Sequence, residues 1–161
     1  MAARAALALV VLVVAPLASA EPVEVHGESD VFAARGVAMA WGVLRGASEA
    51  DTQVVLRVVP LGGAWGAVSV EAVDPFSRER REAMPRRPFT DPIEVRRPRA
   101  SFSDFPRLEI HFHAAAGAPR DARPALTVYY LGVPDTTPEF QSEAALAAHL
   151  ASALARARPP R

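Results

Sequence analysis

The chain has 161 residues, half of them hydrophobic, and its 18 basic residues balance 18 acidic ones, so its formal net charge is zero. A neutral chain has no general electrostatic attraction to nucleic acid or to an anionic membrane surface, and we expect neither as a partner. The chain contains no cysteine, which excludes a disulfide framework and thiolate chemistry.

Residues 1–20 have the pattern of a cleavable secretory signal peptide. Arg4 precedes an apolar run from Ala5 to Leu17, and the segment closes on three small residues ending at Ala20. The run of 13 residues is shorter than the roughly 20 that cross a bilayer, so it predicts export rather than an anchor. We expect a periplasmic or secreted protein with no stable membrane insertion after signal cleavage.

The chain that follows has the patterns of an antiparallel β-sandwich. Seven segments have alternating or continuously apolar residues, with Gly or Pro near their ends. They are Val23 to His26, Val37 to Arg45, Gln53 to Val59, Trp65 to Val73, Pro92 to Arg96, Arg107 to His113 and Leu126 to Leu131. Short strands without crossover helices predict an all-β sandwich over residues 21–134, and the strand count suggests immunoglobulin-like topology.

A C-terminal helix is predicted within residues 135–158, and residues 159–161 form a tail that should fray. The helix should start at Thr137 or at Ser142, each followed by a residue typical of a first turn, and end near Arg156. An apolar stripe on it predicts packing on the sandwich, with presentation to a partner as the alternative. The stripe consists of Leu146, His149, Leu150, Ala153 and Leu154.

The segment from Arg107 to His113 places three potential metal ligands on one strand face. Glu109, His111 and His113 alternate with apolar residues, so their side chains project to one side about 6 to 7 Å apart. Imidazole and carboxylate suit zinc and copper, and His26 is the candidate for a further ligand from a neighbouring strand. The alternative is an outer face exposed to solvent, with no metal or other cofactor bound.

Residues 78–99 carry eight arginines and four acidic residues, interrupted by four prolines. This composition predicts a long, stiff loop around one short strand. Guanidinium groups bind carboxylates in a bidentate manner, so the loop is a candidate site for an anion or for an acidic patch on a partner. The candidate residues are Arg80, Arg81, Arg86, Arg87, Arg96 and Arg97. The alternative is a solvated loop whose acids partly neutralise the arginines.

Two further features bear on binding. Trp41 and Trp65 lie inside strand patterns, where a large aromatic side chain fills a core more often than it binds a sugar. Ala38, Ala40 and Gly42 share one strand face, so a second surface should press closely against it, from this chain or from a partner.

The sequence has no motif of a nucleophile elbow, a phosphate-binding loop or a zinc protease, and we expect no catalytic activity. The leading hypothesis is an exported binding or assembly module that contacts another periplasmic protein. The alternatives are a periplasmic zinc- or copper-binding protein that uses the His-x-His strand, and a carbohydrate- or cell-wall-binding module.

Overall fold

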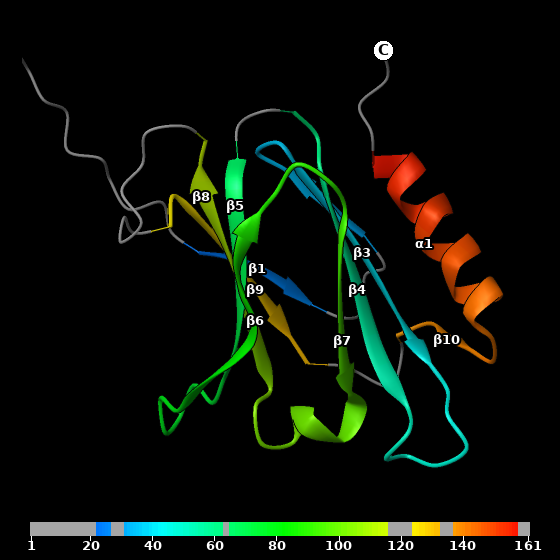
Figure 1. The fold of residues 1–161 in the computed structure, drawn as a ribbon. Coiled ribbons are helices and arrows are strands. Elements are labelled where there is room, and N and C mark those ends of the chain that lie inside the picture. Colours follow the sequence, from blue (N-terminus) through cyan, green and yellow to red (C-terminus); the bar gives the residue numbers. More distant parts are fainter. Residues whose placement is uncertain (1–21, 27–30, 63–64, 116–123, 133–136, 158–161) are drawn as a thin grey trace, which may run out of the picture.

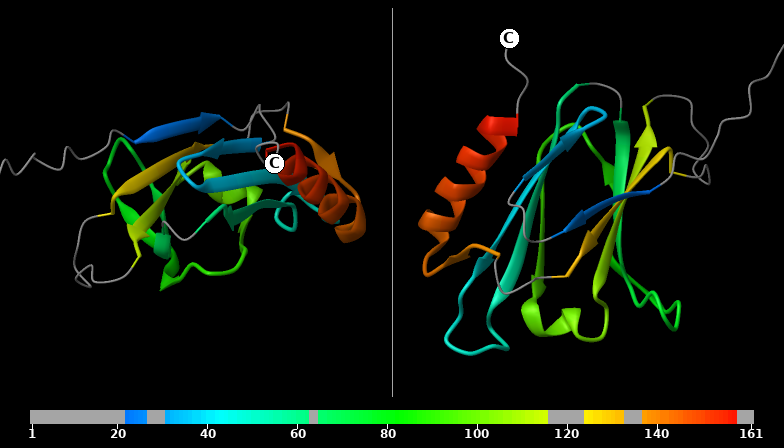
Figure 2. Two further views of the ribbon diagram at one scale, coloured as in Figure 1. Left: turned by 90° about the horizontal axis from the view of Figure 1, so that it is seen from above. Right: turned by 180° about the vertical axis from the view of Figure 1, so that it is seen from behind.

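The computed structural model describes residues 22–26, 31–62, 65–115, 124–132 and 137–157. The predicted signal peptide at 1–20 and the predicted frayed tail at 159–161 lie outside the described residues. The described part forms two sheets that face each other, with one helix on the outside of the second sheet (Figure 1). Views from above and from behind show the same layers (Figure 2). The predicted all-β sandwich with one C-terminal helix is confirmed, whereas immunoglobulin-like topology stays a prediction.

The first sheet has five strands in the order β1, β9, β8, β5 and β6. In that order their bounds are Val23–His26, Leu126–Leu131, Arg107–Ala114, Trp65–Val73 and Arg80–Pro88. The pairings are antiparallel except that of β1 with β9, which is parallel. The strand β8 therefore lies at the centre of the sheet, and β1 and β6 are its edges.

The second sheet has the order β10, β3, β4 and β7, and β2 also pairs with β3. The bounds are Glu139–Phe140 for β10, Val37–Leu44 for β3, Gln53–Pro60 for β4, Ile93–Pro98 for β7 and Val31–Ala34 for β2. The chain crosses between the sheets from β4 to β5 and from β6 to β7. It crosses back from β7 to β8 through the short 3₁₀ helix η1 (Arg99–Phe102).

The main core lies between the two sheets. The longer strands contribute alternate residues, for example Met39 and Trp41 from β3 and Ile110 from β8. Trp41 is fully buried, and its ring meets that of Tyr130 edge to face with the centroids 5.4 Å apart. Such an aromatic pair contributes about 0.5–1.5 kcal/mol beyond the burial of its apolar area.

The helix α1 (Glu143–Ala157) covers the other face of the second sheet, and figures 1 and 2 both show it beside β3. It begins at the second of the two predicted positions, where the Ser142 hydroxyl accepts a hydrogen bond of 3.2 Å from the Ala145 backbone N–H. Its apolar stripe buries Leu146, Leu150 and Ala153 against the sheet.

The closely packed second surface predicted for the small face of β3 belongs to this chain. Ala40 is fully buried under α1. A Cβ atom added to Gly42 would lie 2.9 Å from the Leu146 Cδ1 atom and 3.1 Å from the Phe140 ring. Small residues on β3 therefore let the helix and β10 approach the sheet.

The prediction of a long loop over residues 78–99 is wrong. Residues 80–88 form the edge strand β6, and β7 extends over Ile93–Pro98. An edge strand pairs on one side only, so it tolerates prolines and charged side chains that hide the usual strand pattern. The register shifts where β6 pairs with β5 interrupt the alternation further. The short strands β2 and β10 were also not predicted.

Among the described residues, no helix combines the length and the apolar character that crossing a membrane requires.

We expect Leu150→Ala to lower the free energy of unfolding by about 2–5 kcal/mol, because it removes a fully buried side chain from the interface of α1 with the sheet. Leu154→Ala is the matched control on the same helix, where the side chain is only partly buried, and it should cost less than half as much. Urea unfolding of the two variants measures both effects. Equal losses would show that the helix does not bury its stripe in solution.

Candidate functional site

The outer face of the first sheet holds the residues predicted as metal ligands on β8. Glu109, His111 and His113 project from this face, while their neighbours Leu108, Ile110 and Phe112 lie in the core. The face is not open to solvent, because Glu109 is only 1% exposed and His113 only 7%. The alternative of a solvated face is therefore wrong for these two residues: β8 is the central strand, and at Glu109 the side chains of Arg80 and Arg107 lie against the carboxylate.

Glu71 on β5 completes a cluster with Glu109 and His111. The register places Glu71 directly opposite Glu109. The His111 Nε2 atom lies 3.0 Å from Glu71 Oε2 and 3.5 Å from Glu109 Oε2. One potential ligand atom from each of these residues lies within 4.8 Å of the others. The other ring nitrogen, His111 Nδ1, lies 3.2 Å from the Thr127 hydroxyl on β9, which orients the ring.

Two arginines neutralise the carboxylates of this cluster. The Arg80 Nη1 atom lies 2.7 Å from Glu71 Oε2 and 2.7 Å from Glu109 Oε2, so it bridges the two. The Arg107 Nη2 atom lies 2.6 Å from Glu109 Oε1, and its guanidinium stacks 4.1 Å from the centroid of the Tyr129 ring. Glu109 is thus a buried carboxylate with charged partners at both oxygens, as burial of a charge requires.

The cluster has the donor types of a zinc site, but Arg80 lies where a bound cation would interact with both carboxylates. The two carboxylates and two guanidiniums carry equal and opposite formal charge, so a dication would add uncompensated charge unless Arg80 moved. As folded, the arrangement suits a structural ion-pair network better than a metal centre.

The other two predicted ligands lie outside this cluster. His113 is buried farther along β8, opposite Ala67. His26 is exposed on the edge strand β1, opposite Leu131, which itself pairs with Arg107. His26 is therefore two strands, roughly 10 Å, from the line of β8, and four residues, roughly 13 Å, along the sheet from His111.

Glu71 was missed because its role depends on strand pairing. The sequence shows it in an alternating strand, but nothing in the sequence indicates that this strand pairs with Arg107–His113 or in which register. A shift of one residue would have placed Glu71 opposite core residues of β8.

The six predicted arginines divide into two groups, and two of them serve the fold. Arg80 bridges Glu71 and Glu109 in the cluster described above. Arg96 on β7 bonds Glu94 Oε1 at 2.6 Å and Glu143 Oε2 on α1 at 2.9 Å, which ties the helix to the sheet. The hydrogen bonds that Arg96 donates to Glu143 and to Glu94 raise its pKa above its usual value.

The other four arginines lie along the open side of the sandwich, where β6 and β7 are the edges of the two sheets. Arg81 is paired with Ala72 and Arg97 with Val54, both core residues, so these two side chains project toward the space between the sheets. Arg86 and Arg87 are exposed nearer the other end of β6.

Arg97 is partly buried, and among the described residues its side chain makes one hydrogen bond, from Nε to the Ser101 hydroxyl at 3.3 Å. Burial, and then the like charge of Arg81, lower the pKa of Arg97 below its usual value. The Arg81 guanidinium lies 4.5 Å from the centroid of the Phe105 ring and 3.2 Å from the Glu79 carboxylate, with which it forms an ion pair. The two arginines thus carry more positive charge than the described residues around them neutralise.

The tryptophans leave little surface for a sugar. Trp41 is fully buried. Trp65 is partly buried, packs against Phe112, and donates its indole N–H to the Arg35 carbonyl at 2.9 Å. Part of the Trp65 ring remains accessible, so the carbohydrate alternative stays a prediction that depends on this one residue.

Comparison with known proteins returned no matching family model, no matching curated protein and no matching solved structure.

The ion pairs of Glu71 predict a loss of stability in acid. Burial raises the pKa of this carboxyl, but hydrogen bonds from His111 and Arg80 outweigh it and hold the pKa below the ordinary 4.5. The unfolded chain then binds the proton first, so stability is retained above pH 4.5 and falls as the pH drops through the folded pKa. Glu71→Gln should be less stable at neutral pH and lose less in acid. Urea unfolding between pH 3 and 7 measures both, and parallel curves would contradict the prediction.

Zinc should stabilise the cluster only when Arg80 is absent. We expect Zn²⁺ to change the melting temperature of the wild type little, and to raise that of Arg80→Ala, in which two carboxylates and His111 lose their competing cation. Adding His111→Ala should remove the response, whereas adding His113→Ala should leave it, because His113 lies outside the cluster. Melting with Zn²⁺ and then with EDTA tests this. A wild-type response as large as that of Arg80→Ala would show that Arg80 does not block the site.

Proposed function

We propose that the protein is an exported, non-catalytic binding module that recognises an acidic segment of a partner protein. The binding surface is the open side of the sandwich between β6 and β7. The observation that carries the proposal is Arg97, a partly buried guanidinium beside Arg81 that has a hydroxyl as its bonded neighbour.

The charges on this side favour an anionic partner. Removing a guanidinium from water costs free energy unless an acceptor replaces the water, and a second positive charge nearby adds to the cost. A carboxylate between Arg81 and Arg97 would neutralise the one positive charge that Glu79 leaves uncompensated, and it would accept charge-assisted hydrogen bonds from both guanidiniums. The Ser101 hydroxyl and the Phe105 ring already hold these side chains in place, which lowers the entropy lost on binding.

The edge strands favour recognition by side chains over addition of a partner strand. Strand β6 contains Pro85 and Pro88, which lack a backbone N–H, and its pairing with β5 is interrupted by register shifts. A partner strand would find few regular backbone donors there. The exposed Arg86 and Arg87 extend the positive surface along the same strand.

Metal binding is the second candidate function. The close approach of Glu71, Glu109 and His111 favours it, and it requires displacement of Arg80. The zinc measurement proposed above separates the two candidates, because the acidic-segment proposal does not involve this cluster.

We expect a labelled oligoglutamate peptide to bind the protein and an oligolysine peptide of equal length not to bind. Arg81→Ala/Arg97→Ala should weaken oligoglutamate binding at least about tenfold, since each charge-assisted hydrogen bond contributes roughly 1.5–3 kcal/mol. Fluorescence anisotropy measures the affinities.

The control is Arg45→Ala/Arg156→Ala, which removes the same charge from two exposed positions. Arg45 directly follows β3, and Arg156 lies on α1. Equal losses in the two double variants would show attraction by net charge alone and would overturn the assignment to Arg81 and Arg97. Circular dichroism of Arg97→Met, which keeps the length of the side chain without its charge, checks that the fold survives.

A further inference from the structure

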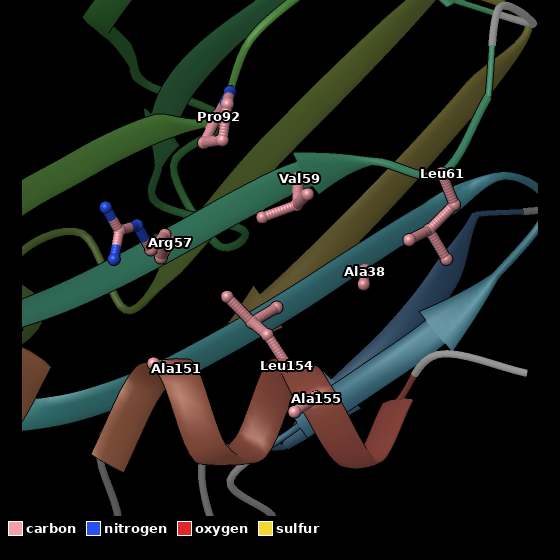
Figure 3. A pocket seen from close by; sticks show the side chains of 8 residues that line it. All are labelled: Ala38, Arg57, Val59, Leu61, Pro92, Ala151, Leu154 and Ala155. Atoms are coloured by element: carbon pink, nitrogen blue, oxygen red, sulfur yellow. The ribbon is translucent and has the colours of Figure 1, made fainter. Parts of the chain in front are cut away.

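A groove of about 280 Å³ lies between α1 and the outer face of the second sheet (Figure 3). Ala38 on β3 and Val59 on β4 form its floor, and Ala151 and Leu154 of the helix form one wall. Leu61 lies at one end. The groove is on a different element pair from the β6–β7 side of the sandwich, so it is independent of the proposed function.

The groove exists because small residues leave space beside the helix. The helix packs on β3 through its buried leucines, while Ala38 and Ala151 are too small to fill the space next to that contact. The outer residues of β4 are consequently covered unevenly: Val55 is fully buried under the helix, but Val59 is only partly buried.

Arg57 lies at the end of the groove opposite Leu61, as Figure 3 shows. It is partly buried and makes no hydrogen bond or ion pair with any residue that the structure describes. Its cross-strand neighbour is Glu94, whose carboxylate bonds Arg96 instead. An apolar groove thus ends at a guanidinium whose donors are free to bind a carboxylate.

We propose that this groove binds one straight-chain aliphatic carboxylate, a free fatty acid of medium length. The carboxylate bonds Arg57, and the chain lies over Val59 and Ala38 toward Leu61, against Leu154. The volume lies just below the roughly 300–1,000 Å³ of ligand pockets, which suits a single chain rather than a two-chain lipid or a fused-ring ligand. The single charge at one end matches an occupant with one charged head.

The test compares decanoate with decanol, which has the same chain without the charge, by isothermal titration calorimetry on the whole protein. Decanoate should bind with one-to-one stoichiometry, and decanol at least about tenfold more weakly. Arg57→Gln should lower decanoate affinity by a similar factor and leave decanol unchanged. Equal affinities of the two ligands for the wild type would overturn the role of Arg57.

Ala151→Phe should fill the groove and abolish binding of both ligands. Ala151 is exposed on α1, so the substitution leaves the buried stripe intact, and Ala145→Phe is the matched control at an exposed position of the same helix outside the groove. Retained binding by Ala151→Phe would place the ligand elsewhere.

Two further measurements distinguish a fatty acid from other occupants of the groove. Binding to phosphatidylglycerol vesicles with no binding of monomeric decanoate would indicate a membrane surface and overturn the proposal. Decanoate binding only by a chain that ends at Ala157 would show that the protein's own C-terminal segment fills the groove, and would overturn it as well.

Discussion

The double burial of β3 is the constraint from which the rest of the structure follows. One face of this strand packs in the main core, and the other lies under α1, so Val37 to Val43 are all buried. A strand with two buried faces needs a cover on each, and this chain supplies the first sheet on one side and its own helix on the other. The alanines that permit close helix packing also leave the groove beside it.

The first sheet differs from the second, because no layer of described elements covers its outer face. Polar residues on the central strand β8 would be solvated on a flat sheet, yet the arginines of β6 and β8 fold over them. Glu109 becomes a buried charge whose two oxygens both face guanidiniums. The same network ties the edge strand β6 to the centre of the sheet, so its charged residues stabilise the fold.

The arginines show why residue type alone does not identify a binding site. Arg80 and Arg96 have two carboxylate neighbours each and act as structural ties. Arg97 and Arg57 are also partly buried, but no carboxylate bonds them among the described residues. Both sites proposed for ligands are defined by this difference in neighbours, which is a property of the tertiary structure.

Local patterns in the sequence determined what depends on neighbouring residues: the alternation of Leu108, Ile110 and Phe112, the stripe of α1, and its start at one of two capping residues. Those patterns carry the periodicity of a strand or helix, which is set by backbone geometry. Only the tertiary structure decided which strands pair and in which register. That pairing placed Glu71 beside Glu109 and His111 and separated His26 from them, and it left Arg97 and Arg57 with no bonded carboxylate among the described residues. Contacts between distant segments depend on how whole faces are buried rather than on local order.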